Sequence, residues 1–521
     1  MTGKLLVLTA FLLCSGISAE AQQPALRSTP ASREVMLNSA LWLRSTNSAG
    51  LALDSLRRTG DIGLSASYSR GGLKSVWSGE NETDVKVSTS GIAKVGGVTL
   101  YGDFSYDYIA VNSSKYNCVL YEPSWDQPYY VADFSVSDWR KQAYDMQFRA
   151  ASPLFFGGRA SFGLDAGYKA LVGAKQVDPR TETFRYDISV APSAVLQLGE
   201  ASALGLRLEY FHSFERSNPS VENYTETPRV AIMRGLGFYT LGSAGGNIGF
   251  DIFYYKTNRF GGSLQYVLRS RPADLMVEAG VHYTTALVSE NPELPRMRGR
   301  IGKLTVTFDA AAGFGADKNH RLDLDAEFGM TSGYEYNQRF DSSPEVYKWI
   351  TVSNPMMSTY DILEAAAKYS WYRSIASGEY DFKLGAAADI FMMNQRYIAP
   401  ASRFNASNAS LGVFAGWNIH VGRGGRLLPS LNLGWRMSPS GEYFYGDAAP
   451  DNAGAEIVST MYPEELRFLT SDRLESGAGL TWAPAILGSS SLTVSLDAGF
   501  DWSFSLSDWR LDAALGLKYL F

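Results

Sequence analysis

The chain ends with the stretch WRLDAALGLKYLF, residues 509–521, in which apolar side chains occupy every second position. The apolar set consists of Trp509, Leu511, Ala513, Leu515, Leu517, Tyr519 and Phe521. The intervening residues are mostly small or charged. Because successive side chains of a β-strand point to opposite faces, this pattern predicts a strand with one apolar face and one polar face.

The same alternation recurs in other segments, notably over residues 159–170, 319–331, 378–392 and 490–504. Each segment is at least 12 residues long, whereas strands of soluble domains usually have ~5–6 residues. A tilted strand that crosses a membrane needs ~9–11 residues. A soluble sandwich would also need a turn about every 8–12 residues. The lengths therefore favour a membrane barrel whose apolar positions face lipid.

The periodicity predicts about 20 strands, with a range of 16–20, between residues 61 and 521. Two of them are expected near 226–240 and 246–256. Short connections, such as 199–202, alternate with long ones, such as 111–140. Short periplasmic turns and longer outer loops are typical of outer-membrane barrels. The predicted fold is all-β, a transmembrane antiparallel up-and-down β-barrel in the outer membrane of a Gram-negative cell.

The N-terminus, MTGKLLVLTAFLLCSGISAEAQQ, has the features of a secretory signal peptide. Lys4 precedes an apolar run from Leu5 to Leu13, and the small residues Ala19 and Ala21 flank Glu20. The predicted regions are a signal peptide over 1–21, an N-terminal periplasmic segment or small plug over 22–60, and the barrel over 61–521.

Within the second region, SREVMLNSALWL (32–43) is expected to form a short helix in the periplasmic mouth of the barrel. After removal of residues 1–21, Cys118 is the one remaining cysteine. An internal disulfide and a cysteine-based metal site are therefore not expected.

The final residues LKYLF, with Leu517, Tyr519 and Phe521 at alternate positions, resemble the C-terminal assembly signal of bacterial outer-membrane barrels. The resemblance implies recognition by the barrel-assembly machinery. The segments LWLRSTNSAGLA (41–52) and MRGLGFYT (233–240) are similar to uncharacterised outer-membrane barrel proteins of the Bacteroidetes type. These proteins form a family that is defined by a domain of unknown function. This likeness implies a barrel over nearly the whole mature chain and brings no catalytic or ligand residues.

Charged side chains on the polar faces are the candidates for the barrel interior. Asp323, Asp325 and Glu327 stand at i, i+2 and i+4 of one predicted strand, with Lys303 on the preceding strand and Lys368 on the following one. Such carboxylates could hold a divalent cation. Ion pairing across strands in a wet interior is the simpler expectation.

The sequence offers no local catalytic or cofactor signature. Of the four histidines, His282 and His420 are expected to point inward, on strands that are not neighbours. We therefore expect no enzymatic activity, no cofactor and no metal. The net charge of −6, without a run of basic residues, does not favour nucleic acid as a partner.

The long outer loops are the remaining functional candidates. YEPSWDQPYYVADFSVSDW (121–139) and EYFYGDAAPD (442–451) interleave aromatic and polar residues. Such loops either bind a sugar, a peptide or a partner that covers the barrel, or fold inward and narrow the pore. The leading hypothesis is a non-catalytic pore or transporter for small solutes such as saccharides or peptides, with cationic or neutral solutes preferred. The alternatives are a structural barrel that docks a surface lipoprotein or secretion component, and, less favoured, an outer-membrane hydrolase.

Overall fold

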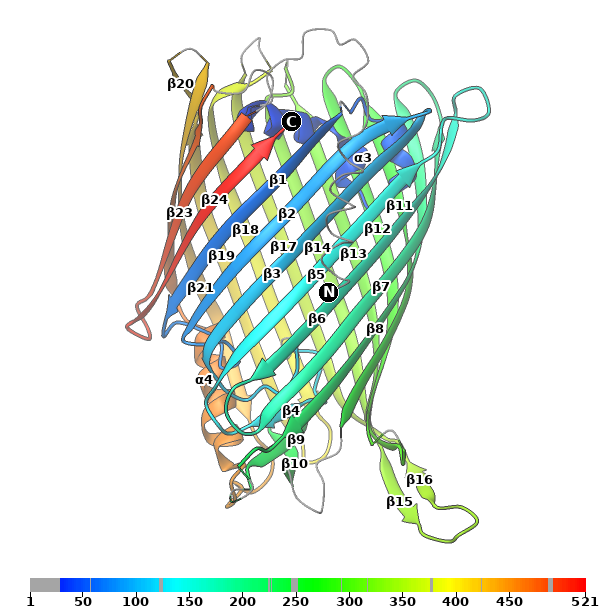
Figure 1. Cartoon of the computed structure of the whole chain (residues 1–521), viewed down its shortest axis with the longest axis vertical. Coiled ribbons are helices and arrows are strands. Elements are labelled where there is room, and N and C mark those ends of the chain that lie inside the picture. Colours follow the sequence, from blue (N-terminus) through cyan, green and yellow to red (C-terminus); the bar gives the residue numbers. More distant parts are fainter. Residues whose placement is uncertain are drawn as a thin grey trace, which may run out of the picture.

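The computed structural model describes residues 29–56, 58–120, 125–223, 225, 227–244, 252–291, 293–315, 317–374, 378–422, 424–485 and 491–521. The predicted signal peptide lies outside these residues. One sheet contains 19 strands, and the short β20 (Ile419–Val421) pairs with β21 alone, so 18 antiparallel strands form the wall of a closed barrel (Figure 1). The prediction of an all-β antiparallel barrel is confirmed.

The wall strands have between 11 and 20 residues, which is long enough for tilted strands to cross a membrane. They are β1 (Thr59–Gly71), β2 (Asn81–Val95), β3 (Val98–Ser114), β5 (Ser137–Ala151), β6 (Ala160–Lys175), β7 (Arg180–Gln197), β8 (Ser202–Ser220), β11 (Phe253–Arg269), β12 (Ala273–Glu290), β13 (Arg296–Phe314), β14 (His320–Glu335), β17 (Met356–Ser374), β18 (Tyr380–Tyr397), β19 (Ser402–Trp417), β21 (Gly425–Phe444), β22 (Arg473–Ala483), β23 (Ser491–Ser503) and β24 (Asp508–Leu520).

The C-terminal stretch forms the strand that closes the barrel. β24 pairs with β1 from Asp61 opposite Leu520 to Gly71 opposite Arg510. Beyond the strand, the backbone N–H of Phe521 donates to the carbonyl of Gly60 at 3.0 Å, and the reverse bond measures 2.8 Å. Closure leaves no open sheet edge, which a membrane interior requires.

The expected number of 20 strands was too high by two, within the predicted range. The segment near 226–240 alternates like a wall strand, but it forms the hairpin of β9 (Arg229–Gly235) and β10 (Phe238–Ser243), which lies away from the wall. Of the segment near 246–256, the described residues from Phe253 onward begin β11, and residues 246–251 lie outside the described part of the chain. A period of two identifies a strand and does not identify the sheet to which it belongs.

The two ends of the barrel differ. At the short-turn end, where the C-terminus lies, the elements α2 (Pro30–Ser39), α3 (Leu41–Arg44) and η1 (Ser48–Ala52) sit within the ring of strands (Figure 1). We call residues 29–56 the N-terminal segment. No helix among the described residues is long and apolar enough to cross a membrane.

At the opposite, long-loop end, several loops pack together into what we call the cap (Figure 1). The cap comprises the described residues of 115–134, 229–243 and 446–470. Its regular elements are β9, β10, β4 (Val131–Asp133), η2 (Ile457–Met461) and α4 (Tyr462–Leu469). A separate hairpin, β15 (Asn337–Asp341) and β16 (Lys348–Ser353), projects beyond the wall at this end.

Candidate functional site: a chamber in the barrel interior

A polar cavity lies in the barrel between the N-terminal segment and the cap. Its volume is 620 Å³, and Thr46 of the N-terminal segment and Asp126 of the cap both line it. A second cavity of 480 Å³ shares Thr307, Asp309 and Glu327 with the first. We call the two together the inner chamber.

The first cavity carries charges of both signs that are largely paired. Glu209 pairs with Arg207 on its own strand and with Arg259 on the neighbouring one. Lys303 contacts Asp126 of the cap at 2.7 Å and Glu327 on β14 at 3.7 Å. The ion pairs in this part of the chamber therefore join neighbouring wall strands to one another and the cap to the wall.

The second cavity is acidic. Five carboxylates line it, those of Asp325, Glu364 and Asp389 together with the shared Asp309 and Glu327. One cation, Arg436, also lines it and pairs with Glu475 at 3.2 Å. In the sheet register, Asp309 stands opposite Asp325, and Glu327 stands opposite Glu364. Like charges directly opposite one another destabilise a sheet, so this wall favours a positive charge in the chamber.

The N-terminal segment reaches much of the wall through polar contacts. Glu34 accepts hydrogen bonds from Lys383 at 2.9 Å and from Tyr380 at 2.7 Å, both on β18. Arg44 forms an ion pair of 2.8 Å with Asp323 on β14. Thr46 donates its backbone N–H to Glu278 on β12 at 3.0 Å.

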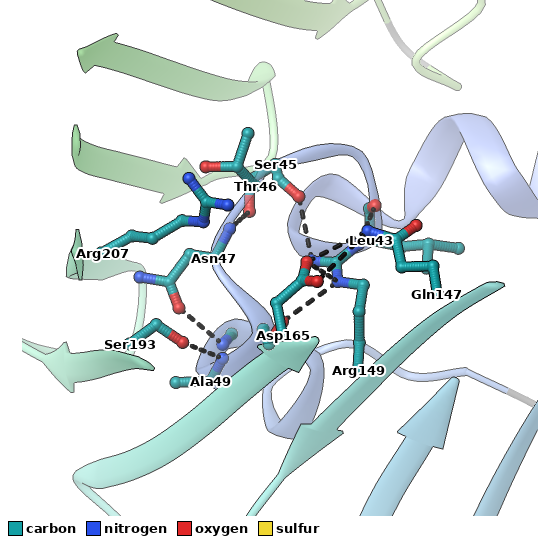
Figure 2. A network of polar contacts seen from close by, with 12 residues as sticks. Leu43, Ser45, Thr46, Asn47, Ala49, Gln147, Arg149, Asp165, Ser193 and Arg207 are labelled. Atoms are coloured by element: carbon teal, nitrogen blue, oxygen red, sulfur yellow. Dashed lines mark hydrogen bonds and ion pairs between the residues drawn. The ribbon is translucent and has the colours of Figure 1, made fainter. Parts of the chain in front are cut away.

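Arg149 on β5 is the centre of the largest of these networks (Figure 2). Its guanidinium donates to the carbonyls of Leu43 and Ser45, each at 2.9 Å, and to the Ser48 hydroxyl at 3.2 Å. The Asp165 carboxylate lies 3.9 Å away. Arg149 is buried, so this network binds the turn between α3 and η1 to the wall without competition from bulk water.

The next turn of the segment contacts strands β6 to β11. Asn47 donates to the carbonyl of Ala194 at 3.1 Å and to Gln265 at 2.8 Å. The backbone N–H of Ala49 donates to Ser193 at 3.0 Å (Figure 2). A Cβ atom at Gly163 would lie 2.2 Å from the backbone nitrogen of Ala49, so glycine at this position allows the close approach.

The cap is held mainly by apolar packing. Its buried cluster includes Tyr130, Val131, Ile232, Ile457 and Met461 and continues onto inward side chains of the wall. Of the aromatic segment 121–139, residues 125–134 thus fold inward, whereas the residues from Ser137 onward belong to the wall strand β5.

Polar contacts also fasten the cap. Trp125 stacks over Phe404 with ring centroids 6.0 Å apart. The side-chain amide of Gln395 donates to the backbone carbonyl of Trp125 at 2.6 Å. Arg234 pairs with Glu335, which also accepts from Tyr397 at 2.5 Å.

A buried carboxyl group joins α4 to the loop between β1 and β2. Glu465 accepts from the Ser75 hydroxyl and from the Val76 backbone N–H, each at 2.8 Å. Burial raises the pKa of Glu465 to about 7. This contact of the cap therefore depends on pH near neutrality.

The residues singled out in the sequence occupy several environments. Asp323 pairs with Arg44 and with Arg321 of its own strand. The Lys368 ammonium lies 4.9 Å from the ring centroid of Phe414. No group of three or more metal-ligating side chains occurs within the described residues.

The C-terminal residues and the histidines are placed as follows. Leu517, Tyr519 and Phe521 are all exposed on the outer face, and the rings of Tyr519 and Phe521 stack at 5.8 Å. His282 lines the inner chamber, whereas His420 lies on the short β20 with its Nε2 3.9 Å from Glu379.

Sequence reasoning missed several residues that form the site, above all Arg149, Arg207, Glu209 and Glu278. A signal was present, because each is a charged residue at an inward position of a predicted strand. The residues that they contact in the N-terminal segment and the cap lie outside regular strands, so no alternation of side chains indicated these contacts.

The comparisons place the chain within a family. A model of the family described as "Family of unknown function (DUF6850)" matches residues 48–519. No curated protein matches the chain.

Solved outer-membrane barrels are similar in fold. They include pyoverdine-bound FpvA of P. aeruginosa (9% identity, TM-score 0.41, 89% of this chain and 72% of that chain). They also include the ferric citrate transporter FecA (8%, 0.40, 88% and 78%) and the outer membrane transporter YddB from Escherichia coli (8%, 0.39, 88% and 80%). At these TM-scores the likeness carries no argument about function.

Proposed function

The chain belongs to the DUF6850 family, whose function is unknown, and we propose that it is a non-catalytic outer-membrane conduit for small polar solutes, gated by its N-terminal segment. The observation that carries the proposal is the inner chamber, a polar space between two inserted parts of the chain. A cavity of 620 Å³ is within the usual range of sites for small molecules.

Of the two inserted parts, the N-terminal segment is the better gate. The cap shares a large buried apolar cluster with the wall, and undocking it would expose that surface to water. The N-terminal segment contributes Leu41, Trp42 and Ala49 to a smaller cluster. Its other contacts are mainly hydrogen bonds, which on release are exchanged for bonds to water at a net cost of about 0.5–1.5 kcal/mol each, and more where a charge is involved.

The acidic part of the chamber favours cationic or neutral solutes over anionic ones. Two pairs of carboxylates oppose one another across β13, β14 and β17, and a cationic solute relieves this repulsion. Saccharides or peptides with a free amine have this chemistry.

Solute entry into liposomes that contain the protein tests the proposal. Arg149→Met should loosen the gate, and arginine should then enter faster than glucose, and glucose faster than glutamate. Adding Asp325→Asn and Glu364→Gln should reduce the preference for arginine. Glu345→Gln, a matched change in the exposed hairpin, should leave it unaltered. Equal rates for the three solutes, or no entry with the loosened gate, would contradict the proposal.

One observation favours the alternative of a partner-docking barrel. The hairpin β15–β16 projects beyond the wall and exposes Tyr347 and Val352, at 59% and 70% of their surface. An isolated two-stranded hairpin is marginally stable in water, so a partner that covers it would stabilise it. Removal of residues 337–353 should abolish co-purification of such a partner and leave solute entry unchanged.

A further inference from the structure

A basic and aromatic patch covers part of the outer face of the barrel near the long-loop end. It consists of the outward side chains of Arg216, Lys256 and Arg300, together with Phe184, Tyr186, Phe214, Tyr254 and Tyr334. We propose that this patch binds the anionic phosphate monoester headgroup of a membrane lipid in the leaflet at the long-loop end.

The orientation of the three cations follows from their neighbours in sequence. Glu215 and Ser217, on either side of Arg216, are buried in the interior. Tyr255 beside Lys256 and Ile301 beside Arg300 are also buried, and both line the inner chamber. Because side chains alternate along a strand, all three cations point away from the interior.

The cations are grouped across neighbouring strands. Lys256 of β11 stands opposite Phe214 of β8 and, on its other side, opposite Leu287 of β12. Leu287 in turn stands opposite Arg300 of β13. Arg216 stands opposite Tyr254 of β11, two residues from Lys256. The three positive charges therefore lie close together on the outer face of the barrel.

The aromatic rings form a continuous layer beside these charges. Ring centroids lie 6.1 Å apart for Phe184 and Tyr186, 5.5 Å for Tyr186 and Phe214, and 5.9 Å for Phe214 and Tyr254. The Arg300 guanidinium lies 4.5 Å from the centroid of Tyr334. Aromatic rings of this kind gather at the level of lipid headgroups.

The depth of the patch agrees with this placement. Along β8 the outward positions are leucine at 204, 206 and 208, followed by Tyr210, His212, Phe214 and then Arg216. The apolar band thus ends in aromatic residues and then in a cation. This is the order expected where hydrocarbon gives way to headgroups.

The charge of the patch selects the kind of lipid. None of the outward side chains of β8 between Leu204 and Ser220 is a carboxylate. The same holds for the outward side chains of β11, β12 and β13 between Tyr254 and Phe314, all of which are described residues. On the neighbouring strand β7, the exposed acid Glu182 stands opposite Asn218, two residues beyond Arg216. Three cations beside the single acid Glu182 leave an excess of positive charge, which complements a phosphate monoester better than a zwitterionic headgroup.

Lipid binding to the purified protein in detergent tests this inference, with phosphatidic acid and phosphatidylcholine as probes. The wild type should retain phosphatidic acid in preference to phosphatidylcholine. The triple variant R216Q/K256Q/R300Q should bind phosphatidic acid roughly a hundredfold more weakly, since each cation near a membrane surface contributes about one kcal/mol. The single Lys256→Gln variant should lose a smaller part of the affinity for phosphatidic acid. It remains informative if the triple variant folds poorly.

The matched control removes three outward cations elsewhere, in R70Q/R140Q/R396Q, and should bind as the wild type does. Equal binding by the patch variant and the wild type would overturn the inference, as would an equal loss in both triple variants. Displacement of phosphatidic acid by excess inorganic phosphate would show a site for free anions and would likewise overturn it.

Discussion

Replacement of Arg149 by methionine should release the N-terminal segment while leaving the barrel intact. Methionine keeps much of the volume of the side chain and removes all of its hydrogen-bond donors. The carbonyls of Leu43 and Ser45 and the hydroxyl of Ser48 then lose their partner, and Asp165 loses its nearest cation.

The magnitude follows from the burial of this network. Removing one partner of a buried charged pair usually costs about 3–5 kcal/mol. This cost falls on the docking of the N-terminal segment, because Arg149 joins that segment to the wall. The ratio of undocked to docked segment should therefore rise by between about 10²- and 10⁴-fold.

Hydrogen exchange of the backbone amides of residues 41–50 measures this ratio, because exchange tracks the population of the open form when closing is fast. These amides include that of Ala49, which is bound to Ser193 at 3.0 Å. Arg140→Met is the matched control, since Arg140 lies on the same strand and contacts Asn112 at 2.9 Å, away from the N-terminal segment. The control should leave exchange in residues 41–50 unchanged.

The reasoning would be refuted if Arg149→Met left exchange in residues 41–50 at the wild-type rate in a folded barrel. It would also be refuted if the wall strands exchanged as fast as the N-terminal segment, because the network would then stabilise the barrel as a whole.

Three other measurements bear on the cap, the register and assembly. Burial raises the pKa of Glu465 from 4.5 to about 7. The contribution of Glu465 to cap docking is therefore full below about pH 4.5 and is lost as the pH rises through about 7. Glu465→Gln should make the protease resistance of α4 independent of pH in this window, and an unaltered pH profile of the variant would contradict this role of Glu465. In a Cys118→Ser background, cysteines at Leu496 and Asp497 should differ in labelling by a water-soluble thiol reagent in intact membranes, since they face lipid and interior respectively; equal labelling would contradict the register. Phe521→Ala should slow the appearance of the folded, heat-modifiable form, and assembly at the wild-type rate would argue against an assembly signal at the C-terminus.

The alternation of side chains was sufficient to predict the barrel because a membrane wall has two uniform environments. Leu496 and Leu515 are both exposed on the outer face of the barrel, so a local pattern is enough to predict their orientation. The hairpin β9–β10 shows the limit of this signal, since it alternates like the wall and belongs to the cap.

The site was less predictable because it depends on contacts between distant parts of the chain. Asp323 was expected to face inward, but its partner Arg44 lies 279 residues earlier in the sequence. Lys303 likewise meets Asp126, which belongs to an irregular loop. The positions of such residues are fixed by packing inside the finished barrel, and no local period encodes them.

Single-channel conductance across a planar bilayer tests most directly whether the N-terminal segment gates the barrel. Cysteines can replace Ala49 and Ser193, which are joined by a hydrogen bond of 3.0 Å, in a Cys118→Ser background. With the disulfide formed the protein should be silent, and after reduction it should show discrete openings. Openings that persist with the disulfide formed would contradict the gate.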